Sequence, residues 1–458
     1  MNNKIKENLG IILIIIFFVF IFSLHLNPDA DLWWDSSVYI NMGKYIYSSG
    51  EAGLYESSRP LIWPLILGFF WKLGLDVIFF GKLLVLLFGI GIIILTYLIS
   101  YQLFNKKTAL LSSLLLSFSP TFFLFNSIVF TGVPSTFFSM FGIYLFIQKN
   151  YSLSGLFFGT AFMTRFFQIS VIIPIYLFFI YLICKKQSTL RKFLISISFF
   201  SLPIIPYLIS NLILYNSLIH PFQLQAYMTK FTGWIFHQPF SFYFLNLIKE
   251  NILLLFSILG IVFIFKNEKL NKFIIPFVFL FTFIPYNLAL HKEMRLLLPV
   301  FPLLYILTSY GIIKSSNLFK NHKNIILLII VLIGLVQITP QLRLNNYDDN
   351  LDVFYDFVKD NDIENIWISN PSFIAHKDTK ADELIYYPLY NTKKMIELQS
   401  NIDQAKLVLI NTCDILPCPP QESSCNQEHN NFINMLKEKM NVNHYEKLND
   451  CEYYILTS

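Results

Sequence analysis

The feature of this chain that most constrains its fold is a succession of long apolar runs separated by short polar segments. Of its 458 residues, 55% are hydrophobic, only 14% are charged, and 49 are phenylalanine. A soluble protein of this length would expose far more charge, so the composition indicates a polytopic membrane protein. The net charge of +5 is modest, and no nucleic-acid partner is expected.

The apolar runs predict an all-α membrane domain, because a helix needs about 20 residues to cross a bilayer. We expect eleven spans, close to 9–24, 77–104, 108–127, 131–148, 153–168, 170–184, 193–214, 247–265, 273–290, 296–313 and 324–340. The two runs between 153 and 184 are short and could form one bent unit, which would leave ten.

Two further apolar segments are predicted to lie in the membrane interface instead of crossing. The run 61–75 is too short to span, begins with prolines and carries Lys72 near its end. The segment 36–48 spaces its apolar residues for one helical face.

The distribution of Lys and Arg predicts the orientation of the chain. With the N-terminus in the cytoplasm, the inner loops collect most basic residues of the membrane part and only two acids, Glu7 and Glu268. Counting 61–75 as a span would reverse every later loop. No small-residue cleavage site follows the first run, so we expect it to stay as a span of a multi-pass plasma-membrane protein.

This topology leaves 26–76, 216–246 and the turn 290–295 on the outer face. It divides the chain into a membrane domain, 1–340, and an extracytoplasmic tail, 341–458, which turns polar and charged. For the tail we predict a small α/β domain, with helices at 352–360 and 429–439 and strands at 365–369, 406–411 and 452–457.

Four of the five cysteines lie in this tail: Cys413, Cys418, Cys425 and Cys451. An oxidising outer face favours two disulfides, with three possible connectivities. The alternative is a zinc site built from Cys413, Cys418, Cys425 and His429, although the spacing matches no standard finger.

Asp35 is the first candidate for chemistry. It follows Trp33 and Trp34, aromatic residues typical of the headgroup level, and precedes an amphipathic segment. A carboxylate placed there can act as a general base on an acceptor hydroxyl. Asp29 and Asp31 nearby resemble a pair that holds Mg²⁺ or Mn²⁺, although a charged loop start explains them equally well.

A group of cationic residues forms the second candidate. His291, Lys292 and Arg295 crowd five residues of the outer turn, where basic residues are normally scarce. Arg165 lies near the outer end of a short span among aromatic residues, where a charge needs a partner or a cavity. Both suit a lipid phosphate, which arginine grips through two oxygens. The alternatives are snorkelling side chains and a structural ion pair.

Three other polar residues of the outer loops are candidates for sugar or acceptor binding. His237 occupies the large loop 216–246, beside aromatic residues suited to stacking on a sugar. Glu56 and Arg59 precede the second interfacial segment, where they could line an acceptor entrance or pair with each other.

Several of these motifs together resemble the GT-C superfamily of glycosyltransferases, in particular the protein-mannosyltransferase and aminoarabinose-transferase types. Asp35-Ser36-Ser37-Val38-Tyr39 resembles the Asp-x-x-x-Tyr segment of their first outer loop, and Arg59-Pro60-Leu61-Ile62-Trp63-Pro64 the interfacial run that follows. Ser154–Gly159 leading to Thr164-Arg165 resembles a glycine-rich short span, and His291–Leu296 the His-Lys-Glu-x-Arg-Phe motif. Phe130–Ser135 resembles a Thr-Asp-Val-Pro element, but Gly132 replaces the acid. The resemblance covers about residues 1–340.

The resemblance implies a transferase that takes a sugar from a polyprenyl-phosphate donor to a hydroxyl of a glycan, lipid or protein acceptor. Asp35 would be the base, Arg165, His291, Lys292 and Arg295 would hold the phosphate, and Tyr39 would join Glu56, Arg59 and His237 around the sugar or acceptor. Two alternatives remain open. One is a flippase or transporter of lipid-linked glycans, which would carry charges near mid-membrane. The other is a metal-dependent transferase of whole glycans.

Overall fold

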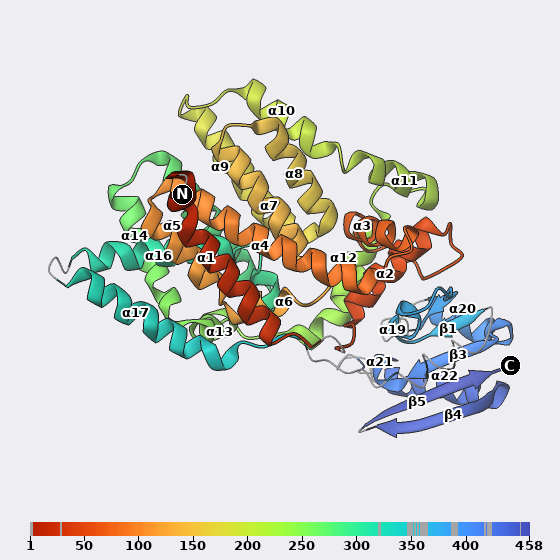
Figure 1. The fold of residues 1–458 in the computed structure, drawn as a ribbon. Coiled ribbons are helices and arrows are strands. Elements are labelled where there is room, and N and C mark those ends of the chain that lie inside the picture. The colour runs from red at the N-terminus through yellow and green to blue at the C-terminus, as the bar shows by residue number, and fades with distance from the viewer. Residues whose placement is uncertain are drawn as a thin grey trace.

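The computed structural model describes residues 3–458 except 28–29, 319–321, 346–350, 352–353, 355–356, 358–364, 386–392, 416–417, 419–423 and 449. Side chains are described for these residues apart from 3–7, 228–233, 267 and 393–395. A large helical part is joined to a small C-terminal α/β part, which lies beside α2 and α3 at one end of the helices (Figure 1).

Each predicted span contains a helix. The helices of these regions are α1 (Asn3–Leu24), α4 (Val77–Leu103), α5 (Lys106–Ser117), α6 (Pro120–Phe125), α7 (Gly132–Ile147), α8 (Tyr151–Thr164), α9 (Ile169–Cys184), α10 (Leu190–Ser201), α11 (Ile205–Tyr215), α13 (Phe242–Glu250), α14 (Phe256–Asn267), α15 (Ile274–Leu288), α16 (Phe301–Ser316) and α17 (Lys323–Ile338). The outer loop adds α12 (His220–Thr232), and short 3-10 turns η1 (Phe166–Gln168), η2 (Gly233–Phe236), η3 (Ile252–Leu255), η4 (Leu270–Phe273), η5 (Met294–Leu297) and η6 (Thr339–Gln341) connect these elements.

Sequence-local features explain where these helices begin. α4 starts where the Asp76 side chain accepts hydrogen bonds from the backbone N–H groups of Ile78 and Phe79, a typical N-cap. Asn105 caps α5 in the same way through Thr108. After the caps, uninterrupted apolar residues favour helix, because every backbone group then pairs inside the segment.

Among the described residues, four helical segments are long and apolar enough to cross a membrane: Val77–Leu103, Phe166–Cys184, Leu270–Leu288 and Lys323–Gln341. A fifth is counted if α10 and α11, bent by 44° at their break, form one span. The helical membrane fold is therefore confirmed, whereas the number of eleven spans stays a prediction.

The two predicted interfacial segments form α2 (Trp34–Tyr47) and α3 (Ile62–Lys72). They pack closely because two glycines meet at their crossing. A Cβ on Gly43 would lie 2.6 Å from the carbonyl oxygen of Pro64, and one on Gly68 would lie 2.5 Å from that of Gly43. Any larger side chain at either position would push the helices apart, so this contact fixes the orientation of α2.

The C-terminal part contains one five-stranded sheet in the order β2-β1-β3-β5-β4. Its strands are β1 (Ile366–Ile368), β2 (Glu383–Leu384), β3 (Leu407–Asn411), β4 (Asn441–Leu448) and β5 (Cys451–Thr457). β1 is parallel to β2 and β3, while β5 is antiparallel to both β3 and β4.

Short helices accompany this sheet: α19 (Ser372–Ala375), α20 (Lys393–Ser400), η8 (Ile402–Gln404), α21 (Thr412–Ile415) and α22 (Cys425–Lys439). The prediction of a small C-terminal α/β fold is confirmed. The helix predicted at 352–360 lies mostly outside the described residues.

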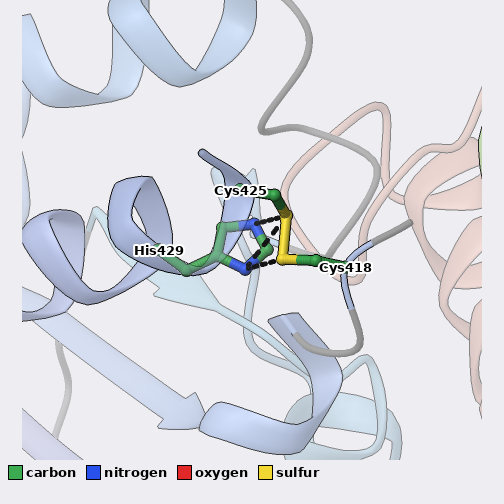
Figure 2. A group of neighbouring side chains, drawn as sticks. All are labelled: Cys418, Cys425 and His429. Carbon is green, nitrogen blue, oxygen red and sulfur yellow. Dashed lines mark hydrogen bonds between the residues drawn. A yellow bond between two sulfur atoms is a disulfide. The ribbon is translucent and has the colours of Figure 1, made fainter. Parts of the chain in front are cut away.

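The structure joins the tail cysteines as Cys413–Cys451 and Cys418–Cys425. The first disulfide links α21, which directly follows β3, to the start of β5. The second lies beside the buried ring of His429, whose Nδ1 is 3.5 Å from the sulfur of Cys418 (Figure 2). Zinc binds thiolates, and these sulfurs are bonded to one another, so the structure favours disulfides over the zinc alternative.

Candidate functional site

Asp35 lies in the first turn of α2. The positive end of the helix dipole favours a carboxylate in the first turn. The side chain is 26% exposed, so the carboxylate is reachable but largely enclosed.

Two arginines from distant parts of the chain grip this carboxylate. The Nη1 of Arg59, in the turn before α3, lies 2.8 Å from one oxygen of Asp35. The Nη1 of Arg295, in η5, lies 2.8 Å from the other oxygen. The start of α2 and the turn after α15 therefore meet at Asp35, across 260 residues of sequence.

Each of these arginines also pairs with a second carboxylate. Glu56 pairs with Arg59 at 2.9 Å, and Glu293 pairs with Arg295 at 2.7 Å. Glu293 also contacts the Nε2 of His291 at 2.8 Å. Hereafter these six residues, Asp35, Glu56, Arg59, His291, Glu293 and Arg295, are called the ion cluster.

Aromatic and hydroxyl groups form the rest of the wall. Tyr39, one helical turn after Asp35, accepts a hydrogen bond of 3.2 Å from Arg59, whose guanidinium lies over the tyrosine ring. Tyr39 also lies 3.5 Å from the hydroxyl of Thr131. The guanidinium of Arg295 lies over the ring of Phe130.

Arg165 reaches the same region from the break between α8 and η1. It lies within electrostatic range of Arg295, Tyr39 and Glu293, and its Nη1 would be 3.2 Å from a Cβ on Gly132. Among the described residues no carboxylate forms a salt bridge with Arg165, and its guanidinium lies over the ring of Phe167, at 5.8 Å. A cation without a salt-bridge partner beside an otherwise paired cluster is a candidate anion site.

Two predicted site residues face elsewhere. Lys292 is 3% exposed, and its ammonium donates to the backbone carbonyls of Gln238 and Ala289. It thereby ties the loop before α13 to the turn after α15 and does not join the ion cluster. His237 is exposed and forms an isolated backbone bridge with His291, so it lies at the rim of the site.

The two arginines decide the charge state of Asp35. Burial raises the pKa of the Asp35 carboxyl, but the positive charges of Arg59 and Arg295 outweigh burial and hold this pKa well below its usual range. The carboxylate is therefore ionised at neutral pH, and its basicity is low while both arginines remain bonded to it.

The predicted metal pair receives no support within the described residues. Asp29 lies outside them, and Asp31 belongs to no described group of carboxylates, histidines or cysteines with metal-binding spacing.

A cavity of about 450 Å³ lies against η5. Thr121, Glu250, Met294 and Arg343 are among the residues that line it, and no member of the ion cluster does. Met294 directly precedes Arg295, so the cavity is adjacent to the ion cluster but does not contain it.

The comparisons with known proteins begin with a sequence match. Residues 58–213 match the model of the dolichyl-phosphate-mannose-protein mannosyltransferase family, a stretch that includes Arg59 and Arg165. No curated protein matches the chain as a whole or in part.

Solved structures match over nearly the full length. The ArnT of Cupriavidus metallidurans, crystallised with undecaprenyl phosphate, has a TM-score of 0.68 at 10% identity, covering 98% of both chains. The Archaeoglobus fulgidus oligosaccharyltransferase tethered to an acceptor peptide has a TM-score of 0.61 at 12% identity, covering 99% of this chain and 74% of that one. The same archaeal enzyme, AglB, with an inhibitory peptide and a dolichol-phosphate, has a TM-score of 0.59 at 11% identity, covering 89% and 69%.

These matches define the class by its fold: over most of its length the chain has the fold of solved glycosyltransferases. The resemblance to the GT-C superfamily is thereby confirmed at the level of the fold. The sequence match, over residues 58–213, is to the dolichyl-phosphate-mannose-protein mannosyltransferase family.

Proposed function

We propose that this protein transfers a sugar from a polyprenyl-phosphate donor to an acceptor hydroxyl on the extracytoplasmic face of the plasma membrane. The observation that carries the proposal is the ion cluster, in which a carboxylate is held between two arginines beside Arg165, with which no described carboxylate pairs. The fold and the family match support the same reaction class. The lipid phosphates bound by ArnT and AglB support a donor of this kind.

In the proposed reaction, Arg165, Arg295 and His291 bind the phosphate of the donor. The acceptor oxygen attacks the anomeric carbon, and the bond between that carbon and the phosphate oxygen breaks. Negative charge develops on the leaving polyprenyl phosphate, where fixed guanidinium groups stabilise it. The proton of the hydroxyl passes to Asp35.

The low pKa of Asp35 sets a condition on this mechanism. While Arg59 and Arg295 both bind it, the carboxylate is a weak base. A phosphate that draws Arg295 toward itself removes one of those charges, so the pKa of Asp35 rises toward its ordinary value when the donor is bound. Donor binding would therefore activate the base.

Tyr39, Glu56 and Arg59 are proposed to shape the acceptor side, because Arg59 binds the Asp35 oxygen that Arg295 does not contact, and Tyr39 and Glu56 both contact Arg59. Lys292 is left out of the phosphate site, since backbone carbonyls already hold its ammonium.

The experiment that tests this proposal is mass spectrometry of cell-surface glycans from cells with and without the protein. Loss of one sugar from a glycan, lipid or protein would identify the donor and acceptor classes. Accumulation of an unflipped lipid-linked glycan, with no change in linkage, would instead favour the flippase alternative. An identical glycan and lipid profile would contradict the proposal.

A further inference from the structure

The helix that carries Asp35 has two functional faces. Tyr39 follows Asp35 by four residues and lies on the same side of α2. Ser37, Asn41 and Lys44 follow it by two, six and nine residues, which at about 100° per residue places them about 180–240° around the helix. The face opposite Asp35 therefore carries three polar residues, and all three are buried.

These three residues contact the C-terminal α/β part. The hydroxyl of Ser37 lies 2.9 Å from that of Ser372. The amide of Asn41 donates to the carbonyl of Pro371 at 2.8 Å. The ammonium of Lys44 donates to the carbonyls of Ala375 at 3.1 Å and Lys377 at 2.6 Å.

Lys44 is the most constrained of these contacts. It is 3% exposed, and its ammonium also pairs with Asp378 at 3.2 Å. An ammonium buried without partners is costly, so α2 keeps this environment only while the segment 371–378 remains docked. Asp378 in turn accepts a hydrogen bond of 2.8 Å from Trp71 of α3, so the same segment holds both interfacial helices.

The loop after α2 completes the attachment through its backbone. The N–H of Gly53 donates to Thr379, and its carbonyl accepts from Ala381. Gly53 has a φ of +77°, and a Cβ there would lie 2.2 Å from the carbonyl oxygen of Asn41. Only glycine allows this loop to lie between α2 and the C-terminal part.

We infer that the C-terminal domain holds α2 in a fixed position, and that Asn41 and Lys44 are positioning residues for Asp35. The domain grips the rear face of α2 and thereby sets the place of the carboxylate on its front face. This inference rests on the proposed function, because it assigns the role of the domain through the role of Asp35.

The test variant is Lys44→Met in the full-length protein, which removes the ammonium but retains a side chain of similar length. A small displacement of a catalytic group lowers turnover by up to about 100-fold. We expect transfer at saturating donor to fall about 10–100-fold, while the affinity for polyprenyl phosphate is unchanged, because Arg165 and His291 lie on other elements. Full turnover would overturn the inference.

The matched control is Lys439→Met. Lys439 lies in the same domain and also pairs with an aspartate, Asp403 at 2.8 Å, but its side chain is 40% exposed and no described contact joins that side chain to α2. We expect unchanged turnover. If the control loses as much as Lys44→Met, general loosening of the domain explains both, and the inference fails.

A cross-link provides the rescue. Ser37→Cys and Ser372→Cys, introduced together into Lys44→Met, would tie α2 to the domain where the two hydroxyls already meet. Recovered turnover in the cross-linked protein supports positioning, and continued loss in protein shown by peptide mass spectrometry to be cross-linked refutes it. If Lys44→Met is not recovered as folded protein, Asn41→Ala replaces it, since it removes one hydrogen bond.

Hydrogen exchange separates this inference from the proposed function. Backbone amides of α2 should exchange faster in Lys44→Met than in the parent protein, whatever reaction the site performs. Unchanged exchange would refute the inference that the domain holds α2 in position, even if sugar transfer is found. Faster exchange in a protein that transfers no sugar would support the attachment of α2 to the domain and refute the proposed sugar transfer.

Discussion

Replacing Asp35 by asparagine separates the chemistry of the ion cluster from its binding of the donor. The substitution keeps the shape and one oxygen acceptor but removes the negative charge that Arg59 and Arg295 share. A hydrogen bond between charged groups contributes about 1.5–3 kcal/mol, so a moderate loss of stability is expected.

The effect on turnover is expected to be much larger. A positioned general base contributes about 10²–10⁴-fold to a rate, which is equal to about 3–5 kcal/mol of barrier. The affinity for the donor phosphate should not fall. Without the carboxylate, Arg295 and Arg59 present more positive charge, so the phosphate binds at least as tightly as before.

The assay compares two quantities in purified protein: transfer of sugar from the polyprenyl-phosphate donor at saturation, and binding of polyprenyl phosphate alone. Asp403→Asn is the control, because Asp403 pairs with Lys439 at 2.8 Å but its side chain is 76% exposed. Full turnover in Asp35→Asn would refute its role as base. Weakened phosphate binding would refute the charge argument and place Asp35 in donor binding.

Four further predictions concern charge and cross-links. Arg165→Ala should weaken polyprenyl phosphate binding about 10–100-fold through lost charge-assisted hydrogen bonds, with little change in melting temperature, because no described carboxylate depends on it. Arg295→Ala should lower both the affinity for polyprenyl phosphate and the melting temperature, because Asp35 and Glu293 each lose an ion-pair partner. Unchanged transfer at limiting donor would show that Arg295 is not part of the site. Burial lowers the pKa of His429 to about 4. Below about pH 6.5 the unfolded chain therefore binds a proton at His429 that the folded domain does not bind. The free energy of unfolding of the domain should fall by about 3 kcal/mol between about pH 6.5 and 4, measured by pulse proteolysis. This pH dependence should be absent in His429→Phe. Removing the Cys413–Cys451 disulfide, across 38 residues, should cost about 4 kcal/mol, against about 2 for Cys418–Cys425 across 7; equal losses would contradict the loop-closure argument.

Apolar runs and charge placement were enough to predict the helical part, because backbone pairing in a membrane leaves few other structures. They also predicted that Asp35 and the 291–295 turn belong to one region. The structure identifies the direct contact between them, which is the 2.8 Å ion pair of Asp35 with Arg295. The pairing of Arg59 with Asp35 was not predicted. The sequence does not show whether Arg59 pairs with Asp35 or with Glu56, and in the structure Arg59 contacts both.

Other features carried no signal that sequence reasoning could use. Lys292 and Lys44 both donate to backbone carbonyls, and a carbonyl belongs to every residue type, so neither partner leaves a trace in the sequence. The strand β4 was missed because it is a mostly exposed edge strand with a polar sequence, and such a strand has little hydrophobic alternation.

The place of β5 in the sheet has a consequence for how the protein is made. This strand lies between β3 and β4, and residues 451–457 are therefore needed before the sheet can close and before Cys451 can meet Cys413. Since that sheet belongs to the part that grips α2, a nascent chain would complete its membrane helices early but gain an ordered reaction centre only after the ribosome has passed residue 457. Partly synthesised copies in the membrane would then lack the ordered ion cluster.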